Sequence, residues 1–102
     1  MRLAAVLLVA ACAGCGHRVS SSATAKHPEK PAPCGIRFEK AGGQEPAYES
    51  IGTVTLYTVD SDVVTDEMKR DLEREACKMG GDVLTILGPA PHGVRYTVWR
   101  KK

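Results

Sequence analysis

The chain has 102 residues, of which 25% are charged and 43% are hydrophobic, as in one small globular domain. Lysine and arginine total 14 and aspartate and glutamate total 12, which gives a formal charge of +2. This balance is too even for a nucleic-acid-binding protein, and no basic stripe with interleaved aromatic residues occurs, so we expect no nucleic-acid partner. The short chain also leaves little room for a large catalytic cleft.

The N-terminus has the pattern of an export signal. Arg2 supplies a positive charge, and residues 3–11 are apolar without a break, a run shorter than the roughly 20 residues that span a bilayer. Val9-Ala10-Ala11-Cys12 resembles a bacterial lipobox, in which the Cys sulfur receives a diacylglycerol and the chain is cut before the Cys. We therefore predict a lipoprotein signal peptide over residues 1–11 and an acylated lipid anchor on Cys12. The alternatives are an ordinary secretory signal and a buried hydrophobic start.

The residue after the predicted anchor bears on localisation. Cleavage would place Ala13, and not an aspartate, second in the mature chain. In enteric bacteria this resembles the pattern of lipoproteins that are transferred to the outer membrane. We therefore expect a protein of the bacterial cell envelope, attached to the outer membrane by the lipid on Cys12 and facing the periplasm. The inner membrane is the alternative.

Residues 12–33 are rich in Gly, Ser, Ala, Pro and Lys and show no hydrophobic period. Such a segment buries too little apolar surface to offset the entropy of ordering it. We predict that it is a flexible tether, stiffened by prolines near its end, and that the folded domain covers residues 34–102. His17 and His27 lie in this segment, but neither stands at ligand spacing with another strong metal ligand.

Two strands are predicted at the start of the domain. Ile36 and Phe38 alternate with charged residues, which is typical of a half-buried strand. Residues 51–59 are rich in β-branched side chains and predict a second strand. The segment 41–46 between them contains two glycines and a proline, so we expect a loop there.

A helix is predicted after the second strand. Its apolar residues recur at steps of four, four and three, which places one stripe on a helix; they are Met68, Leu72, Ala76 and Met79. Thr65 or Asp62 would cap its N-terminus, and Gly80 with Gly81 would end it. The charged residues on the other side predict a solvated face, not a site.

Two further strands are predicted after the helix. Residues 83–87 form a short, mostly apolar run, and residues 94–100 alternate between apolar and polar. Residues 88–93 are too rich in Pro and Gly for a regular element, so we expect a loop. We expect Trp99 to pack over a sheet edge or the helix. The order β-β-α-β-β predicts a small α+β domain with one helix on an antiparallel or mixed sheet.

Lipidation of Cys12 would leave Cys15, Cys34 and Cys77 for other chemistry. An oxidising compartment and a domain of about 70 residues favour a disulfide, so we predict a Cys34–Cys77 bond. The helical period puts Cys77 roughly opposite Met68, so we expect its side chain to point outward or sideways. The alternative is two unpaired cysteines, and a free thiol at Cys15 would be available for an intermolecular disulfide.

Cys34, Cys77 and His92 are the candidates for a metal or small-ligand site. Zinc sites usually draw their ligands from close pairs, and these three residues are isolated in the sequence, so we expect no metal and no cofactor. His92 lies between Pro91 and Gly93 and is interpreted as an exposed turn residue. No nucleophile with a neighbouring base is recognisable, so we expect no enzymatic activity. A metal- or small-ligand-binding envelope module is the alternative function.

Three segments of the domain together resemble a known family. They are Cys34-Gly35-Ile36-Arg37-Phe38, Pro46-Ala47-Tyr48-Glu49-Ser50-Ile51-Gly52-Thr53-Val54 and Glu75-Ala76-Cys77-Lys78-Met79-Gly80-Gly81-Asp82-Val83-Leu84. This pattern resembles small bacterial envelope lipoproteins of the RcsF and YbjQ-like group, which carry a Y-x-x-I-G-x-V strand and a helix that ends in Ala-(Cys)-x-x-Gly-Ala-Asp-Ala-Val. Gly81 stands where that family has alanine, and the four-cysteine disulfide pattern of its stress sensor is absent.

The resemblance implies a compact α+β domain over residues 34–102 without a cofactor. In the sensor of that group, it also implies a role exercised by contact with other envelope proteins. We therefore expect a non-enzymatic, lipid-anchored protein that presents a disulfide-stapled domain to an envelope protein partner, in stress sensing or assembly.

Overall fold

The computed structural model of the chain describes residues 17–59 and 63–102. The predicted signal peptide over residues 1–11, the predicted lipidation site Cys12 and the thiol of Cys15 lie outside these residues. The described elements are β1 (His17–Ala23), β2 (Arg37–Glu39), β3 (Tyr48–Thr58), α2 (Asp66–Lys78), β4 (Val83–Ala90) and β5 (Gly93–Lys101). Within the described ranges, no helix is long and apolar enough to cross a membrane.

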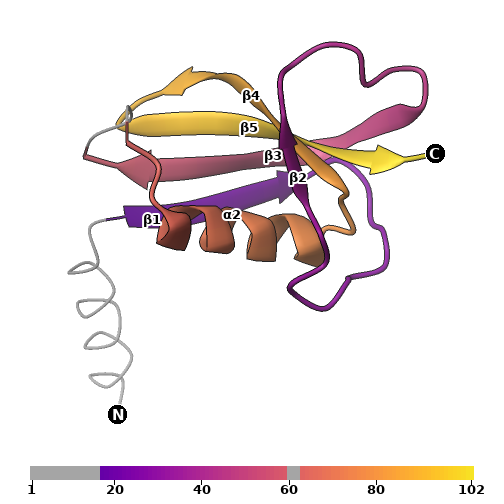
Figure 1. Cartoon of the computed structure of the whole chain (residues 1–102), viewed down its shortest axis with the longest axis horizontal. Coiled ribbons are helices and arrows are strands. Elements are labelled where there is room, and N and C mark those ends of the chain that lie inside the picture. The colour runs from indigo at the N-terminus through magenta and orange to yellow at the C-terminus, as the bar shows by residue number, and fades with distance from the viewer. Residues whose placement is uncertain (1–16, 60–62) are drawn as a thin grey trace.

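The strands form one mixed sheet in the order β1-β3-β5-β4-β2. Neighbouring strands run antiparallel, except that β2 runs parallel to β4. Helix α2 lies across one face of this sheet, against β1 and β3 (Figure 1). The α+β class is therefore confirmed, with one helix on a mixed sheet in the described part of the chain. The predicted order β-β-α-β-β matches the structure from β2 onward. The structure has one further strand, β1, that the prediction does not include.

Strand β1 corrects the prediction of a flexible tether over residues 12–33. It pairs antiparallel with β3 along its whole length, from the pair His17–Thr58 to the pair Ala23–Gly52. The strand is polar because it lies at a sheet edge, where few side chains have to be buried. Its main-chain hydrogen bonds to β3 offset the entropy of ordering it, which a reading of side-chain composition does not take into account.

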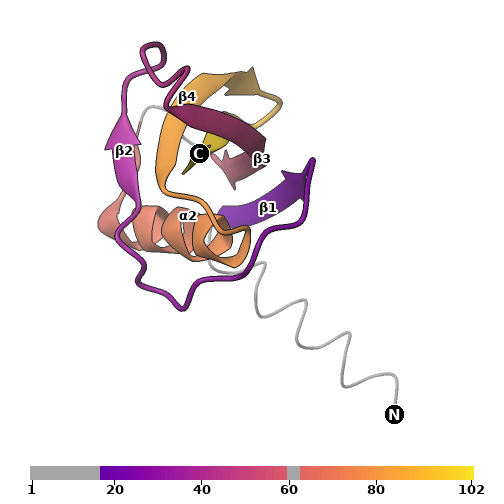
Figure 2. The ribbon, with the colours of Figure 1, turned by 90° about the vertical axis from the view of Figure 1, so that its right-hand side faces the viewer.

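The segment between β1 and β2 is also fixed to the domain. It passes around the C-terminal end of α2 before it enters β2 (Figure 2). The Lys30 main-chain N–H donates to the carbonyl oxygen of Cys77 at 2.8 Å, and the Lys30 ammonium lies 2.5 Å from a carboxylate oxygen of Asp82. The predicted domain boundary at residue 34 therefore falls inside the fold, which in the described residues begins at His17.

Helix α2 begins and ends as its sequence predicts. The hydroxyl of Thr65 accepts a hydrogen bond from the Met68 N–H at 3.2 Å, so Thr65 is the N-cap. Gly80 follows the helix with φ at +83°, a conformation that favours glycine. A Cβ at Gly80 would also lie 2.7 Å from the carbonyl oxygen of Pro28, so glycine lets the crossing segment approach the end of the helix.

The core lies between α2 and the sheet. Its fully buried side chains come from the helix, from β3 and from the last two strands; the largest include Ile51, Val54, Leu56, Leu72, Leu84 and Val98. The register of β3 with β5 shifts between Ser50 and Gly52, and this irregularity allows Ile51 to join Val54 and Leu56 in the core.

The β4–β5 hairpin corrects the prediction of a loop over residues 88–93. Strand β4 continues to Ala90, and only Pro91 and His92 separate it from β5. Proline is tolerated at Pro89 because β2 pairs only with residues 83–85, which leaves the outer edge of β4 open beyond them. His92 has φ at +60° and is the turn residue that the sequence predicts.

Candidate functional site

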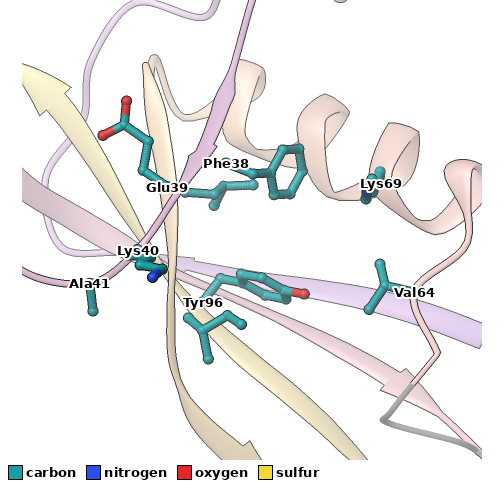
Figure 3. Close-up of a pocket in the computed structure, with 9 residues that line it drawn as sticks. Phe38, Glu39, Lys40, Ala41, Val64, Lys69 and Tyr96 are labelled. Carbon is teal, nitrogen blue, oxygen red and sulfur yellow. The ribbon is translucent and has the colours of Figure 1, made fainter.

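An apolar groove lies on the part of the inner sheet face that α2 does not cover. The helix contacts β1 and β3, so the inner face of β4 and β5 stays open beside β2. The cavity measures about 540 Å³, and we call it the β2 groove. Figure 3 shows its lining, which is formed by Phe38, Glu39, Lys40, Ala41, Val64, Lys69, Leu84, Ile86 and Tyr96.

Two aromatic rings form the centre of the β2 groove. Phe38 from β2 and Tyr96 from β5 meet edge to face, with ring centroids 6.4 Å apart and an interplanar angle of 86°. Tyr96 is 4% exposed, whereas Phe38 is 41% exposed. Phe38 belongs to a three-residue edge strand, and no strand of the described ranges lies beyond it to complete the packing around its ring.

The Tyr96 hydroxyl is a polar group in this apolar setting. It has no hydrogen-bond partner among the described residues, and Figure 3 shows it pointing along the groove toward Val64. Burial raises the pKa of Tyr96 above its ordinary value of 10.0. The hydroxyl therefore keeps its proton at neutral pH and is able to donate a hydrogen bond to a bound molecule as well as to accept one.

Exposed aliphatic side chains extend the apolar surface. Ile86 pairs with Tyr96 across β4 and β5 and is 59% exposed at the groove wall. Val64, just before the helix, lines the opposite side. An apolar surface that is shared by a strand edge, a sheet face and a helix start is typical of a binding surface, since single exposed apolar residues are otherwise scattered.

The rim of the β2 groove carries a positive charge. Lys40 follows β2 and Lys69 lies near the start of α2, on either side of Tyr96 in Figure 3. Neither ammonium forms an ion pair with a described residue. The carboxylate of Glu39 lies 3.2 Å from the Arg37 guanidinium, which offsets its charge. An anionic group on a partner would therefore meet two unpaired cations.

The predicted Cys34–Cys77 disulfide is confirmed, with the two Cα atoms 6.0 Å apart. The expected outward orientation of Cys77 is wrong, because its side chain is fully buried. The segment that carries Cys34 crosses the helix end and covers the side that would otherwise face solvent. The bond thus fastens the entry of β2 to the last turn of α2.

The alternative metal site at Cys34, Cys77 and His92 is wrong. The disulfide takes both sulfur atoms, so neither is available as a thiolate. The β4–β5 turn that carries His92 lies at the opposite end of the sheet from the C-terminal end of α2 (Figure 1). Across residues 17–59 and 63–102, no group of three His, Cys, Asp or Glu side chains is placed to hold a metal ion.

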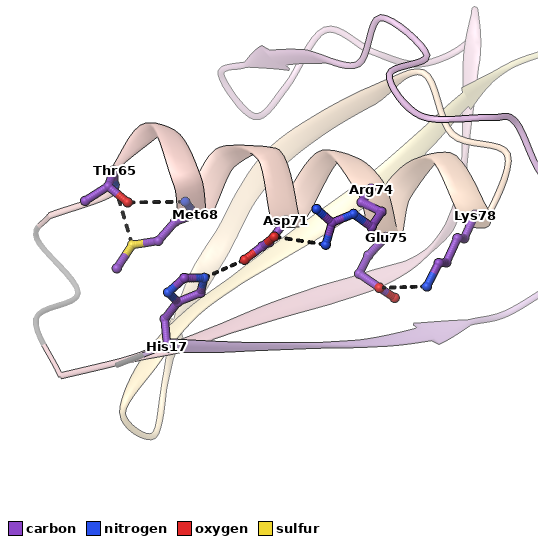
Figure 4. A network of polar contacts seen from close by, with 7 residues as sticks. All are labelled: His17, Thr65, Met68, Asp71, Arg74, Glu75 and Lys78. Atoms are coloured by element: carbon purple, nitrogen blue, oxygen red, sulfur yellow. Dashed lines mark hydrogen bonds and ion pairs between the residues drawn. The ribbon is translucent and has the colours of Figure 1, made fainter. Parts of the chain in front are cut away.

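A polar network joins β1 to the outer side of α2 (Figure 4). The His17 ring nitrogen Nε2 lies 2.5 Å from Asp71, whose other carboxylate oxygen accepts from Arg74 at 3.0 Å. Further along β1, the Ser21 hydroxyl donates to Glu75 at 3.1 Å. These contacts hold the edge strand β1 against the helix. The charged residues on this face of α2 therefore have a structural role. His17 belongs to the fold and not to a tether.

Sequence reasoning did not single out the groove residues. Apolar residues that alternate along a strand predict a core, and Phe38 and Tyr96 follow that rule on the inner face of the sheet. One indication is present in the sequence: a single short helix cannot cover the whole face of the predicted four-stranded sheet, so part of the apolar face has to remain open.

Comparisons with known proteins bear on the fold alone. No protein-family model matches the chain, and no curated protein matches it. Among solved structures, the chain is similar to the crystal structure of a Francisella virulence factor, FvfA, with a TM-score of 0.51 and 14% sequence identity. The similarity covers 81% of this chain and 95% of that chain. At this identity it supports the α+β fold and carries no function across.

Proposed function

We propose that this protein is a non-enzymatic, lipid-anchored docking protein of the bacterial cell envelope that binds a protein partner through the β2 groove. The observation that carries the proposal is the open apolar groove of about 540 Å³ with an aromatic pair at its centre. A small domain with a limited core loses stability by exposing such a surface, so its retention is best explained by a partner that covers it.

The envelope location rests on the sequence of the N-terminus. The early charge, the short apolar run and the lipobox at Cys12 support export and lipidation, and the disulfide is consistent with an oxidising compartment. The intact mass of the protein, extracted from its own membranes without reductant, tests this part. Loss of residues 1–11, added acyl mass and two missing hydrogens are expected, whereas a cleaved chain without lipid would contradict the anchor.

Crosslinking in intact cells tests the docking role. Ile86, at the groove wall, is replaced by the photoreactive p-benzoylphenylalanine, and Arg95, an exposed residue of β5, is replaced in the same way as the matched control. Ultraviolet light is expected to join an envelope protein to the chain at position 86 and not at position 95. The same products from both positions, or none from position 86, would contradict docking through the groove.

A small-ligand-binding module is the second candidate function. The groove volume falls within the roughly 300–1,000 Å³ that is usual for small-molecule sites, and an apolar lining with few polar groups is typical of them. Thermal unfolding in the presence of laurate separates the candidates. A rise in Tm that Phe38→Asp abolishes would favour the small ligand, and an unchanged Tm together with the crosslink would favour the protein partner.

A further inference from the structure

We propose that the β2 groove binds an extended peptide segment of its partner as an added strand on the open edge of β2. In this segment, two aliphatic residues that point into the groove are flanked on the same face by acidic residues. This inference rests on the proposed docking function and adds the chemistry of the partner. Its three parts are the apolar pocket, the unpaired main chain of β2 and the cationic rim.

The apolar pocket fits aliphatic side chains from one face of a strand. Phe38, Ile86 and Tyr96 surround a volume of about 540 Å³, more than a single aliphatic side chain fills. Side chains two residues apart on a strand lie on the same face, about 7 Å from each other. An extended segment would therefore place two aliphatic side chains in the groove and cover both aromatic rings.

The open edge of β2 supplies main-chain hydrogen bonds. The Arg37 N–H donates to the carbonyl oxygen of Asp82 at 3.1 Å, so the main-chain groups of Arg37 face β4. Because these groups alternate in direction along a strand, those of Phe38 point away from β4. Figure 2 shows β2 at the outside of the sheet with no strand beyond it. No described residue pairs with the N–H and C=O of Phe38, so these groups are available to an incoming strand.

The rim selects the charge of the segment. Lys40 and Lys69 line the groove without an ion-pair partner among the described residues, and Glu39 is held by Arg37. Successive side chains of a strand point to opposite faces, so the residues that reach the rim are the groove-facing ones on either side of the two aliphatic residues. Carboxylates there would complement the two ammonium groups, whereas lysine or arginine there would be repelled. The unpartnered Tyr96 hydroxyl offers one further hydrogen bond inside the groove.

Selection from a peptide library tests the segment. The full chain, held in lipid nanodiscs, selects binders from a phage-displayed library of random nonapeptides. We expect enriched peptides in which two aliphatic residues, two positions apart, are flanked on the same face by aspartate or glutamate. Enriched peptides that are neutral or basic, or no enrichment at all, would overturn the inference while the crosslink at position 86 still tests the docking function independently.

Charge reversal tests the rim. The double variant Lys40→Glu/Lys69→Glu should bind the best selected peptide at least tenfold more weakly, as measured by fluorescence anisotropy. Lys26→Glu/Lys102→Glu changes the net charge equally at exposed residues outside the groove, and it should bind the peptide as the unaltered protein does. An equal loss in both variants would mean that only net charge matters, and no loss in either would remove the role of the rim.

Methylation of the peptide main chain tests strand addition. The best peptide is synthesised with alternate amide nitrogens methylated, in each of the two possible registers, which removes donors but keeps the side chains. Binding at least tenfold weaker in one register is expected from pairing with the edge of β2. Unchanged binding in both registers would overturn strand addition, and displacement of the unmethylated peptide by laurate alone would indicate a small amphipathic ligand instead.

Discussion

Phe38 and Tyr96 meet edge to face with their centroids 6.4 Å apart, although the first belongs to an edge strand and the second to the central strand β5. The strands that carry these rings, β2 and β5, are joined by β4, which pairs with both. The contact therefore sets the position of β2 relative to β5 on the sheet side of the β2 groove, while Val64 and Lys69 line its other side.

Tyr96→Phe should change the free energy of unfolding by less than about 1 kcal/mol, because the lost hydroxyl has no partner in the described structure. Trp99→Phe is the contrasting variant. The Trp99 indole N–H donates to the Thr85 hydroxyl at 2.9 Å on the face away from α2, so its loss should destabilise by about 1–2 kcal/mol. Urea unfolding measures both. A loss above 2 kcal/mol for Tyr96→Phe would reveal a hydrogen bond to that hydroxyl.

Removal of the disulfide should lower the free energy of unfolding by about 4 kcal/mol, the value of the chain-entropy model for a loop of 43 residues. The variant is Cys34→Ala/Cys77→Ala, and urea unfolding is the measurement. Reductant should destabilise the unaltered chain and leave the variant unchanged. A variant as stable as the parent would show that the crossing segment is held without the bond.

Asp82 should make stability fall in acid. Burial disfavours its charge, but hydrogen bonds from the Lys30 ammonium and the Lys101 N–H outweigh burial and lower the pKa below 3.8. A carboxyl whose pKa is lower in the folded state stabilises above the unfolded-state pKa, and this stabilisation is lost as the pH falls through the folded-state pKa. Urea midpoints between pH 2 and 7 should therefore drop below about pH 4. Asp82→Asn should flatten this dependence, and identical pH profiles would contradict the assignment.

Hydrogen exchange should show that β1 belongs to the fold. Antiparallel pairing with β3 directs alternate N–H groups of residues 17–23 toward β3, so these should exchange more than a hundredfold slower than in an unstructured peptide. The outward-facing amides of the same strand are the internal control. Uniform exchange at unstructured rates across the strand would restore the tether that the sequence predicts.

The parts of the fold that follow side-chain periodicity are predictable from the sequence. The helix from Asp66 to Lys78 has an apolar stripe, a threonine cap and a following glycine, and each of these local signals agrees with the others. Strands β3 and β5 alternate clearly, and Leu56 and Val98 are buried as the alternation predicts. The Cys34–Cys77 bond agrees with the prediction from an expected oxidising compartment and the small size of the domain.

The remaining features depend on contacts between distant segments. Strand β1 is ordered by main-chain pairing with β3, which a run of serines does not reveal. Cys77 is buried because a segment about 45 residues earlier in the chain crosses over it, and helical period describes only the helix itself. The β2 groove arises from what the helix leaves uncovered, and this depends on the strand order of the sheet.

The start of β1 at His17 limits how far the domain could lie from a lipid anchor at Cys12. Only residues 13–16 separate His17 from Cys12, and five peptide units span at most about 18 Å. A lipid on Cys12 would therefore keep the domain close to the surface of its bilayer, and the domain would explore only a thin layer of the compartment next to the membrane. Partners would have to come to that layer, as membrane proteins of the same bilayer or as soluble proteins that approach its surface.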